Sequence, residues 1–190
     1  SLRELAESGF EEGSKEYTDK QTELIMSMWS NKNITEPYMP GSTFKVITTA
    51  MALEEKKVKT TEMFTCTGSM KLGKRTIHCH KLTGHGTVTF ARGLQESCNP
   101  VLMTVGLRMG TDLFKQYFDA FGYSEKTGVD LPGEANSIFF DPFTETDLAV
   151  ASFGQNFKIT ALQQICGITA VANGGNLIKP YMVEKIIDGN

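Results

Sequence analysis

Residues 36–55, EPYMPGSTFKVITTAMALEE, decide how the chain is interpreted. Pro40 and Gly41 precede a run with helical spacing of apolar residues, which predicts a helix from Ser42 to about residue 55. Ser42 and Lys45 are three residues apart and would share one face of that helix. A serine hydroxyl needs a neighbouring base to act as a nucleophile, and the positive end of a helix lowers the pKa of an amine placed there. The pair alone is more often a capped helix start with an exposed lysine.

A second short motif, Ser97-Cys98-Asn99, lies in the segment LQESCNPVLM between two predicted helices. Pro100 suits the first turn of the second helix. A loop at this place can direct one hydroxyl and one amide into a cleft, where the hydroxyl relays a proton and the amide holds a carbonyl group. By itself this motif is an ordinary helix cap.

In combination, S-x-x-K followed by S-x-N is part of the signature of β-lactamases and penicillin-binding proteins. Five segments carry the same resemblance in order: PGSTFK (40–45), GHGTVTFARGLQESCNP (84–100), YSEKTGVDLPGE (123–134), ASFGQNFKITALQQ (151–164) and NGGNLIKPYMVEKI (173–186). On these segments the chain resembles the transpeptidase domain of class B high-molecular-weight penicillin-binding proteins over roughly residues 36–190. Within that class it is most similar to the sporulation-specific, stage V protein D type.

The resemblance implies a peptidoglycan D,D-transpeptidase that cross-links stem peptides through a serine acyl-enzyme. It assigns Ser42 as the nucleophile, Lys45 as the base, Ser97 as the proton relay to the leaving group and Asn99 as the group that holds the substrate amide. It implies that β-lactams bind at Ser42 and that catalysis uses no cofactor. It also implies divisome or sporulation wall-synthesis proteins as partners, and a place at the extracytoplasmic face of the bacterial cell membrane, with the anchor outside this chain.

The third motif of the family, a Lys-Thr-Gly on an edge strand that binds the substrate carboxylate, is expected beyond residue 190. The KTG at residues 126–128 does not fit that role, because Pro132 and Gly133 end any strand shortly after it. The two strands that precede the S-x-x-K helix in the family are also missing from the sequence. The resemblance therefore implies an incomplete domain that is weak or inactive alone.

The expected fold class is α+β and mainly α. It is the helical portion of a penicillin-binding, transpeptidase-like fold with a short β-hairpin, and the central sheet is largely missing. We predict one partial transpeptidase domain over residues 1–190. Residues 1–39 form a polar lead-in with one helix, and residues 40–190 hold the S-x-x-K helix, the hairpin, the SxN loop and a helical lobe.

Individual elements follow from local patterns. The helix of the lead-in, at residues 19–33, has an apolar face whose Trp29 is expected in the core. Short mixed runs around two glycines predict the hairpin at residues 62–81. Two helical pieces are expected in residues 146–173, and a strand-like run at residues 177–188 ends the chain.

Cys66, Cys79, His85 and Cys98 form a candidate Cys₃His metal site, a set typical of structural zinc. The spacing is weak evidence because it contains no C-x-x-C pair. We expect the first two cysteines on opposite arms of the hairpin. If Ser97 and its partner asparagine face the cleft, Cys98 points behind it, so the metal would be structural rather than hydrolytic.

Other states of these residues stay open. Cys66 and Cys79 could form a disulfide, which proteins outside the cytoplasm tolerate, or all thiols could be free. His78 and His80 are alternative ligands. Cys166 lies on an apolar helix and is expected to be a core residue.

The net charge is −3, with both signs scattered along the chain, and no Lys/Arg cluster indicates nucleic-acid binding. Two rival functions remain. One is a serine β-lactamase or β-lactam sensor, for which Glu134 is a candidate to activate water. The other is a catalytically silent fragment that only binds a metal.

Overall fold

The computed structural model describes residues 2–140 and 142–187. The helices are α1 (Leu2–Glu7), α2 (Lys15–Trp29), α3 (Lys32–Thr35), the 3₁₀-helix η1 (Gly41–Phe44), α4 (Lys45–Glu54), α5 (Phe90–Gln95), α6 (Asn99–Met109), α7 (Thr111–Ala120), α8 (Glu145–Ala151) and α9 (Ala161–Ala172). The strands are β1 (Met63–Cys66), β2 (Ser69–Leu72), β3 (Arg75–His78), β4 (Gly86–Thr89), β5 (Ile138–Phe139) and β6 (Phe157–Lys158). The described residues therefore confirm the mainly helical α+β class.

The core is built around Phe44, the last residue of η1, which is fully buried. The centroid of its ring lies 4.8 Å from that of Phe157, 5.4 Å from Tyr123, 6.1 Å from Phe114 and 6.3 Å from Phe118. Aromatic pairs at these separations stabilise a core beyond the area they bury. This cluster fixes the start of α4 against α7 and β6, and with it the residues on either side of Phe44.

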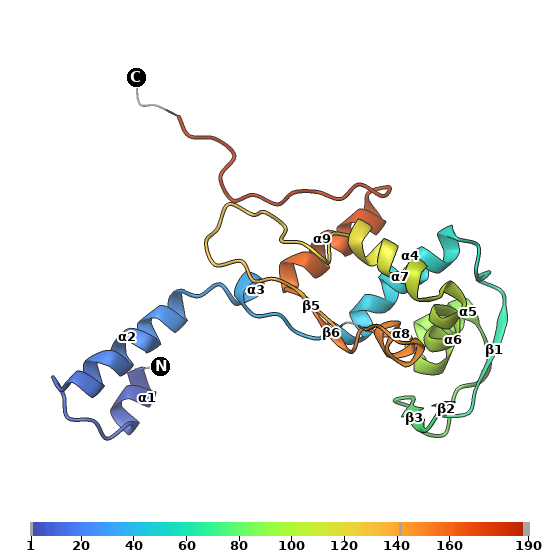
Figure 1. The fold of residues 1–190 in the computed structure, drawn as a ribbon, viewed down its shortest axis with the longest axis horizontal. Coiled ribbons are helices and arrows are strands. Elements are labelled where there is room, and N and C mark those ends of the chain that lie inside the picture. Colours follow the sequence, from blue (N-terminus) through green and yellow to red (C-terminus); the bar gives the residue numbers. More distant parts are fainter. Residues whose placement is uncertain (1, 141, 188–190) are drawn as a thin grey trace.

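Helix α6 lies at the centre of the helical body. It packs against α4, α5, α7 and α8, and α9 lies beside α4 on the other side (Figure 1). Its N-terminus therefore meets the N-terminus of α4 inside the body, which brings the two sequence motifs into one region.

The β-structure differs from the single hairpin predicted at residues 62–81. Only β2 and β3 form a hairpin, while β1 pairs with β4 in antiparallel register from Met63↔Thr89 to Cys66↔Gly86. Gly68 separates the two ladders with a φ of +97°, and a Cβ there would overlap the carbonyl of Leu82. Only glycine fits this turn, so the chain leaves one ladder and enters the other.

The N-terminal segment contains three helices, α1, α2 and α3, where one was predicted. Helices α1 and α2 form an arm that stands away from the body (Figure 1). Helix α2 has no buried residue, and Trp29 is 76% exposed, so the prediction that Trp29 is a core residue is wrong. An apolar helix face is buried only where another element packs on it; α1 packs on α2, but in the described residues no element covers Trp29.

The C-terminal run is also not a strand as far as the structure describes it. Residues 177–187 are extended and lead away from the body (Figure 1). The Asp130 carboxylate accepts hydrogen bonds from the backbone N–H groups of Met182 (2.6 Å) and Val183 (2.9 Å), which holds this run at one point. No helix in the described residues is both long and apolar enough to cross a membrane.

The fold yields a stability prediction at Phe44. Replacing it by alanine removes the centre of the aromatic cluster, and we expect a loss of about 3–5 kcal/mol in the free energy of unfolding. The matched control is Val46→Ala in the first turn of α4, a residue 38% exposed, with an expected loss below about 1 kcal/mol. Urea denaturation followed by circular dichroism measures both. Equal losses would contradict the central role of Phe44.

Candidate active site and metal centre

Ser42 lies in the first turn of η1 and does not cap the helix. The residue at the cap position is Pro40, and no side chain makes a cap hydrogen bond there. A backbone hydrogen bond holds this turn in place, because Gly41 donates its N–H to the carbonyl of Gly154 at 2.8 Å. Gly154 has a φ of +84°, and a Cβ on it would overlap the Gly41 carbonyl. The backbone fixes this turn, and the Ser42 hydroxyl is left for other contacts.

Lys45 is buried, with 1% of its surface exposed, although it is a lysine at the start of a helix. Its Nζ donates to Ser97 O at 2.6 Å, to Ser97 Oγ at 2.9 Å and to Asn99 Oδ1 at 2.8 Å. These three acceptors use all the donors of an ammonium group. The two motifs that the sequence separates by about fifty residues are therefore joined through this one side chain.

Ser97 lies between Lys45 and Ser42. Its Oγ is 3.1 Å from Ser42 Oγ and 2.9 Å from Lys45 Nζ. Ser97 has a φ of +51°, which is uncommon for a residue with a side chain and marks a constrained loop position. In the described residues no hydrogen bond joins Lys45 directly to Ser42, so the direct contact expected from helical spacing is replaced by a contact through Ser97.

Asn99 connects the site to the hairpin. Its Oδ1 accepts from Lys45, and its Nδ2 donates to the carbonyl of His78 at 3.2 Å. His78 is the last residue of β3, so the hairpin ends against the first residue of α6. Both polar atoms of the Asn99 side chain are thus engaged in this structure.

Burial changes the acid–base behaviour of Lys45. Loss of hydration on burial lowers its pKa from 10.5 to about 8. A pKa of about 8 leaves roughly a tenth of the lysines neutral at pH 7 and about half at pH 8. A lysine in this state can accept a proton near neutral pH, which an exposed lysine does far less readily.

A buried polar chain that sequence reasoning missed supports the same turn. The Tyr123 hydroxyl donates to Gln164 Oε1 at 3.2 Å, Gln164 Nε2 donates to Thr43 Oγ1 at 3.3 Å, and Thr43 donates to the Pro40 carbonyl at 2.8 Å. Tyr123 and Gln164 are almost completely buried. The one signal in the sequence was a glutamine on an apolar helix, which does not by itself reveal a partner.

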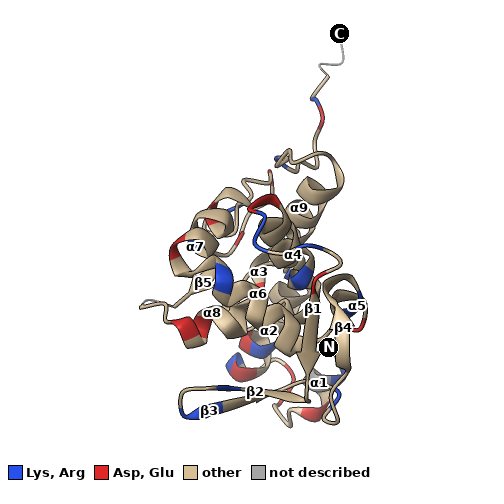
Figure 2. Ribbon diagram, turned by 90° about the vertical axis from the view of Figure 1, so that its right-hand side faces the viewer, with Lys and Arg blue, Asp and Glu red and all other residues tan. Residues whose placement is uncertain are grey.

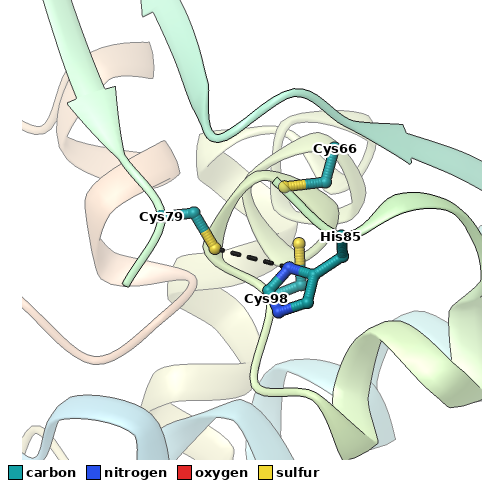
Figure 3. Close-up of side chains that lie close together, drawn as sticks. All are labelled: Cys66, Cys79, His85 and Cys98. Carbon is teal, nitrogen blue, oxygen red and sulfur yellow. Dashed lines mark hydrogen bonds between the residues drawn. The ribbon is translucent and has the colours of Figure 1, made fainter. Parts of the chain in front are cut away.

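Cys66, Cys79, His85 and Cys98 converge behind the SxN loop, as Figure 3 shows, and their ligand atoms all lie within 4.8 Å of one another. The arrangement differs from the expected one in detail. Cys66 ends β1, while Cys79 follows β3 and donates its backbone N–H to Gly68 O at 2.9 Å. The two cysteines therefore meet at the base of the hairpin rather than across its arms.

The chemistry of this cluster suits a metal ion. Cys79 Sγ lies 3.6 Å from His85 Nδ1, close to the separation of two ligands on a tetrahedral ion with bonds of about 2.0–2.3 Å. All four cysteines of the chain are free thiols. Burial lowers the pKa of His85, so its imidazole is the neutral form that binds metals, and its Nε2 is buried without a hydrogen-bond partner. The cluster can therefore hold a metal ion.

The remaining candidates lie outside the site. The KTG at residues 126–128 is in a loop without a strand, and Glu134 accepts hydrogen bonds from Thr127 N (2.7 Å), Thr127 Oγ1 (2.6 Å) and Gly128 N (3.0 Å). Cys166 is a buried residue of α9, as predicted. Neither His78 nor His80 belongs to the four-residue cluster.

The sequence matches a known family over most of its length. Residues 10–189 match the family model described as the penicillin binding protein transpeptidase domain. The chain is 38% identical over 161 residues to stage V sporulation protein D of Bacillus subtilis (strain 168), which covers 83% of this chain and 25% of that protein. It is 31% identical over 163 residues to the peptidoglycan D,D-transpeptidase PbpA of Mycobacterium tuberculosis (strain ATCC 25618 / H37Rv), with coverage of 83% and 33%.

Solved structures give the same picture. The complex of penicillin-binding protein PBP2 with MreC from Helicobacter pylori matches with a TM-score of 0.77 at 25% identity, over 88% of this chain and 34% of that one. Penicillin-binding protein 3 of Mycobacterium tuberculosis, solved with aztreonam, matches with a TM-score of 0.75 at 26% identity, over 82% and 35%. The chain therefore spans about a quarter to a third of the length of these relatives.

Lys45 gives a prediction about protonation. By NMR titration of its side-chain resonances we expect a midpoint near pH 8, well below the ordinary lysine pKa of 10.5. The unfolded chain keeps this proton up to about pH 10.4, so the folded state binds fewer protons between pH 8 and that value. Wild-type stability should therefore rise with pH across this window, relative to Lys45→Met. A midpoint above pH 10, or parallel pH profiles, would contradict the effect of burial.

Proposed function

Because this chain belongs to the family of penicillin-binding protein transpeptidase domains, we propose that Ser42 is the nucleophile of a peptidoglycan D,D-transpeptidase. The observation that carries the proposal is the chain of polar contacts from Ser42 Oγ through Ser97 Oγ to the buried Lys45 amine. A nucleophile, a relay and a base with a lowered pKa stand in hydrogen-bond order, which is the arrangement that acyl transfer requires.

Acylation follows from this order. Ser42 Oγ attacks the carbonyl carbon of the penultimate D-alanine of a stem peptide, while its proton passes to Ser97 Oγ and the Ser97 proton passes to neutral Lys45. The bond to the terminal D-alanine then breaks, and the same path returns the proton to the departing amine. The N–H of Ser42, in the first turn of η1, has no intrahelical partner and can donate to the developing oxyanion.

Deacylation uses the same residues in reverse. The amine of a second stem peptide attacks the acyl-enzyme, its proton passes to Lys45, and Ser42 recovers a proton through Ser97. Asn99 keeps Lys45 in place with Oδ1, and we assign its Nδ2, which bonds His78 O in this structure, to the substrate amide. β-Lactams would acylate Ser42 as mimics of the D-Ala-D-Ala terminus.

Location and partners are proposed by analogy with the relatives. We place the whole protein at the extracytoplasmic face of the bacterial cell membrane, where stem peptides are found. The match to stage V sporulation protein D supports sporulation wall-synthesis proteins as partners, and the solved complex of the Helicobacter PBP2 with MreC supports divisome proteins. No observation favours nucleic acid.

The β-lactamase alternative is less well supported. It needs a carboxylate that activates a deacylating water, and Glu134 was the candidate. Both Glu134 oxygens accept hydrogen bonds from its own loop, at Thr127 and Gly128. We therefore assign Glu134 to closing this loop.

The proposal is tested by acylation with a fluorescent penicillin, located by mass spectrometry. The adduct is expected on Ser42 and to disappear in Ser42→Ala. General-base catalysis contributes about 10²–10⁴-fold, so Lys45→Ala should slow the labelling by a similar factor. Labelling is expected to be weak, because the described residues contain no KTG on a strand. Lys126→Ala is the control and should label as the wild type does. An adduct that persists in Ser42→Ala would overturn the assignment.

We also propose that the cysteine–histidine cluster binds one structural zinc ion. Three sulfurs and an imidazole nitrogen form a closed tetrahedral set with no open position for substrate, which is the pattern of structural zinc. The ion would fix Cys98 and thereby the residues on either side of it, Ser97 and Asn99, without a part in the reaction. Burial raises the pKa of the Cys98 thiol to about 12, so the ion must displace a tightly held proton.

For this site we expect one zinc per chain in protein prepared under reducing conditions, measured by elemental analysis. Cys98→Ser should lower the zinc content and reduce the melting temperature by more than about 5 °C, while Cys166→Ser should leave the zinc content unchanged. Binding should weaken as pH falls, because protons compete for the ligands. A metal-free chain with two thiols missing under denaturation would instead establish the Cys66–Cys79 disulfide.

A further inference from the structure

The charges of the chain are segregated around the β2–β3 hairpin. Residues 63–95 contain no Asp or Glu, although the whole chain has a net charge of −3. The same segment holds all three histidines and the basic residues Lys71, Lys74, Arg75, Lys81 and Arg92. The scatter of charge along the chain as a whole therefore hides one exclusively basic region, visible on β2 and β3 in Figure 2.

The register of the hairpin divides its side chains between two faces. Met70 pairs with Ile77 and Leu72 pairs with Arg75, and the three apolar residues of this face pack toward Met103, Ala149 and Phe153 of the body. Arg75 lies on this inner face near Asp147 of α8, whose carboxylate is already bonded to Thr144 and Asn156. Alternation along a strand places the other residues on the opposite face.

The outer face carries hydroxyl, imidazole and cationic side chains and no carboxylate. Ser69 pairs with His78 and Lys71 pairs with Thr76, and Lys74 lies at the tip. Lys71, Thr76 and His78 are exposed, and no ion pair to Lys71 or Lys74 occurs in the described residues. Unpaired lysines interleaved with hydroxyl groups form a surface that suits carboxylates.

This outer face begins at the active site. Asn99 donates to the carbonyl of His78, and the strand then runs outward to Thr76 and Lys74. At about 3.4 Å per residue, Thr76 is roughly 7 Å and Lys74 roughly 14 Å from that point. An extended peptide that runs from the active site along this strand covers these distances within two to four residues beyond His78. Its acidic groups would then lie opposite the lysines.

We propose that the outer face of the β2–β3 hairpin, defined by Ser69, Lys71, Lys74, Thr76 and His78, binds the carboxylate-bearing part of the peptide substrate. This inference rests on the proposed transpeptidase function and names the property of the substrate that the site selects. The hairpin recognises negative charge on the part of the peptide that extends past His78 along β3. It contributes through charge and hydrogen bonds, and takes no part in the bond-breaking steps.

The experiment is an NMR titration of the isotopically labelled chain at low salt with two synthetic pentapeptides. Both end in D-Ala-D-Ala; one has two free side-chain carboxylates and the other has both amidated. We expect the acidic peptide to shift resonances of Ser69–His78, and amidation to weaken binding about 5- to 30-fold, as two surface ion pairs of about 0.5–1 kcal/mol each predict. Raising the salt concentration should weaken only the acidic peptide.

Charge reversal supplies the matched control. Lys71→Glu/Lys74→Glu should abolish the preference for the acidic peptide, while Lys15→Glu/Lys115→Glu, which changes the net charge equally at exposed sites of α2 and α7, should keep it. The proposal is wrong if the hairpin resonances do not shift at millimolar peptide, or if both variants respond alike. It is also wrong if inorganic polyphosphate shifts the same residues at lower concentration, since the face would then be a general anion surface.

The same variants separate this inference from the proposed function. Penicillin labelling of Ser42 should be unchanged in Lys71→Glu/Lys74→Glu, because a small β-lactam does not reach the hairpin tip. Labelling without hairpin shifts would reject the surface and keep the transpeptidase. Hairpin shifts together with penicillin labelling that persists in Ser42→Ala would keep the peptide surface and reject the nucleophile.

Discussion

The structure depends on the placement of one buried lysine. The four-carbon side chain of Lys45 places its Nζ within 2.9 Å of Ser97 O, Ser97 Oγ and Asn99 Oδ1. A charge removed from water is tolerated only when it is paired or hydrogen-bonded, and here the SxN loop provides every partner. The same burial that requires these partners lowers the pKa of the amine to about 8. The hydrogen bonds that hold Lys45 and its lowered pKa thus have one physical cause, which is its burial.

The neighbouring residue holds this lysine in position. Phe44 points into the aromatic cluster of α7 and β6, while Ser42 and Lys45, on either side of it, meet the SxN loop. A helix that begins with one deeply buried aromatic ring cannot rotate without breaking that packing. Rigid packing on one side and polar contacts on the other therefore fix the distance between the Ser42 and Ser97 hydroxyl groups, on which the proposed acyl transfer depends.

The SxN loop is held from both sides by different chemistry. Ser97 and Asn99 face Lys45, and Cys98 between them joins the cluster with Cys66, Cys79 and His85. The base of the hairpin, turned sharply at Gly68, brings the outer cysteines to this cluster. The hairpin thereby ends against Asn99, so an element that looks peripheral in the ribbon is connected to the polar network.

The sequence by itself determined the family and the helical character, and it supplied the candidate residues of both sites, because these follow from short motifs and from the alternation of apolar and polar residues. It also showed that the KTG at residues 126–128 is in a loop, since a proline close by prevents a strand. Tertiary structure decided what depends on contacts between distant segments. The pairing of β1 with β4 and the contact of Ser42 with Ser97 each join segments far apart in the sequence. Trp29 is exposed because no element of the described residues covers it. Local patterns predict which face of an element is apolar, but only the tertiary structure shows which element packs against that face.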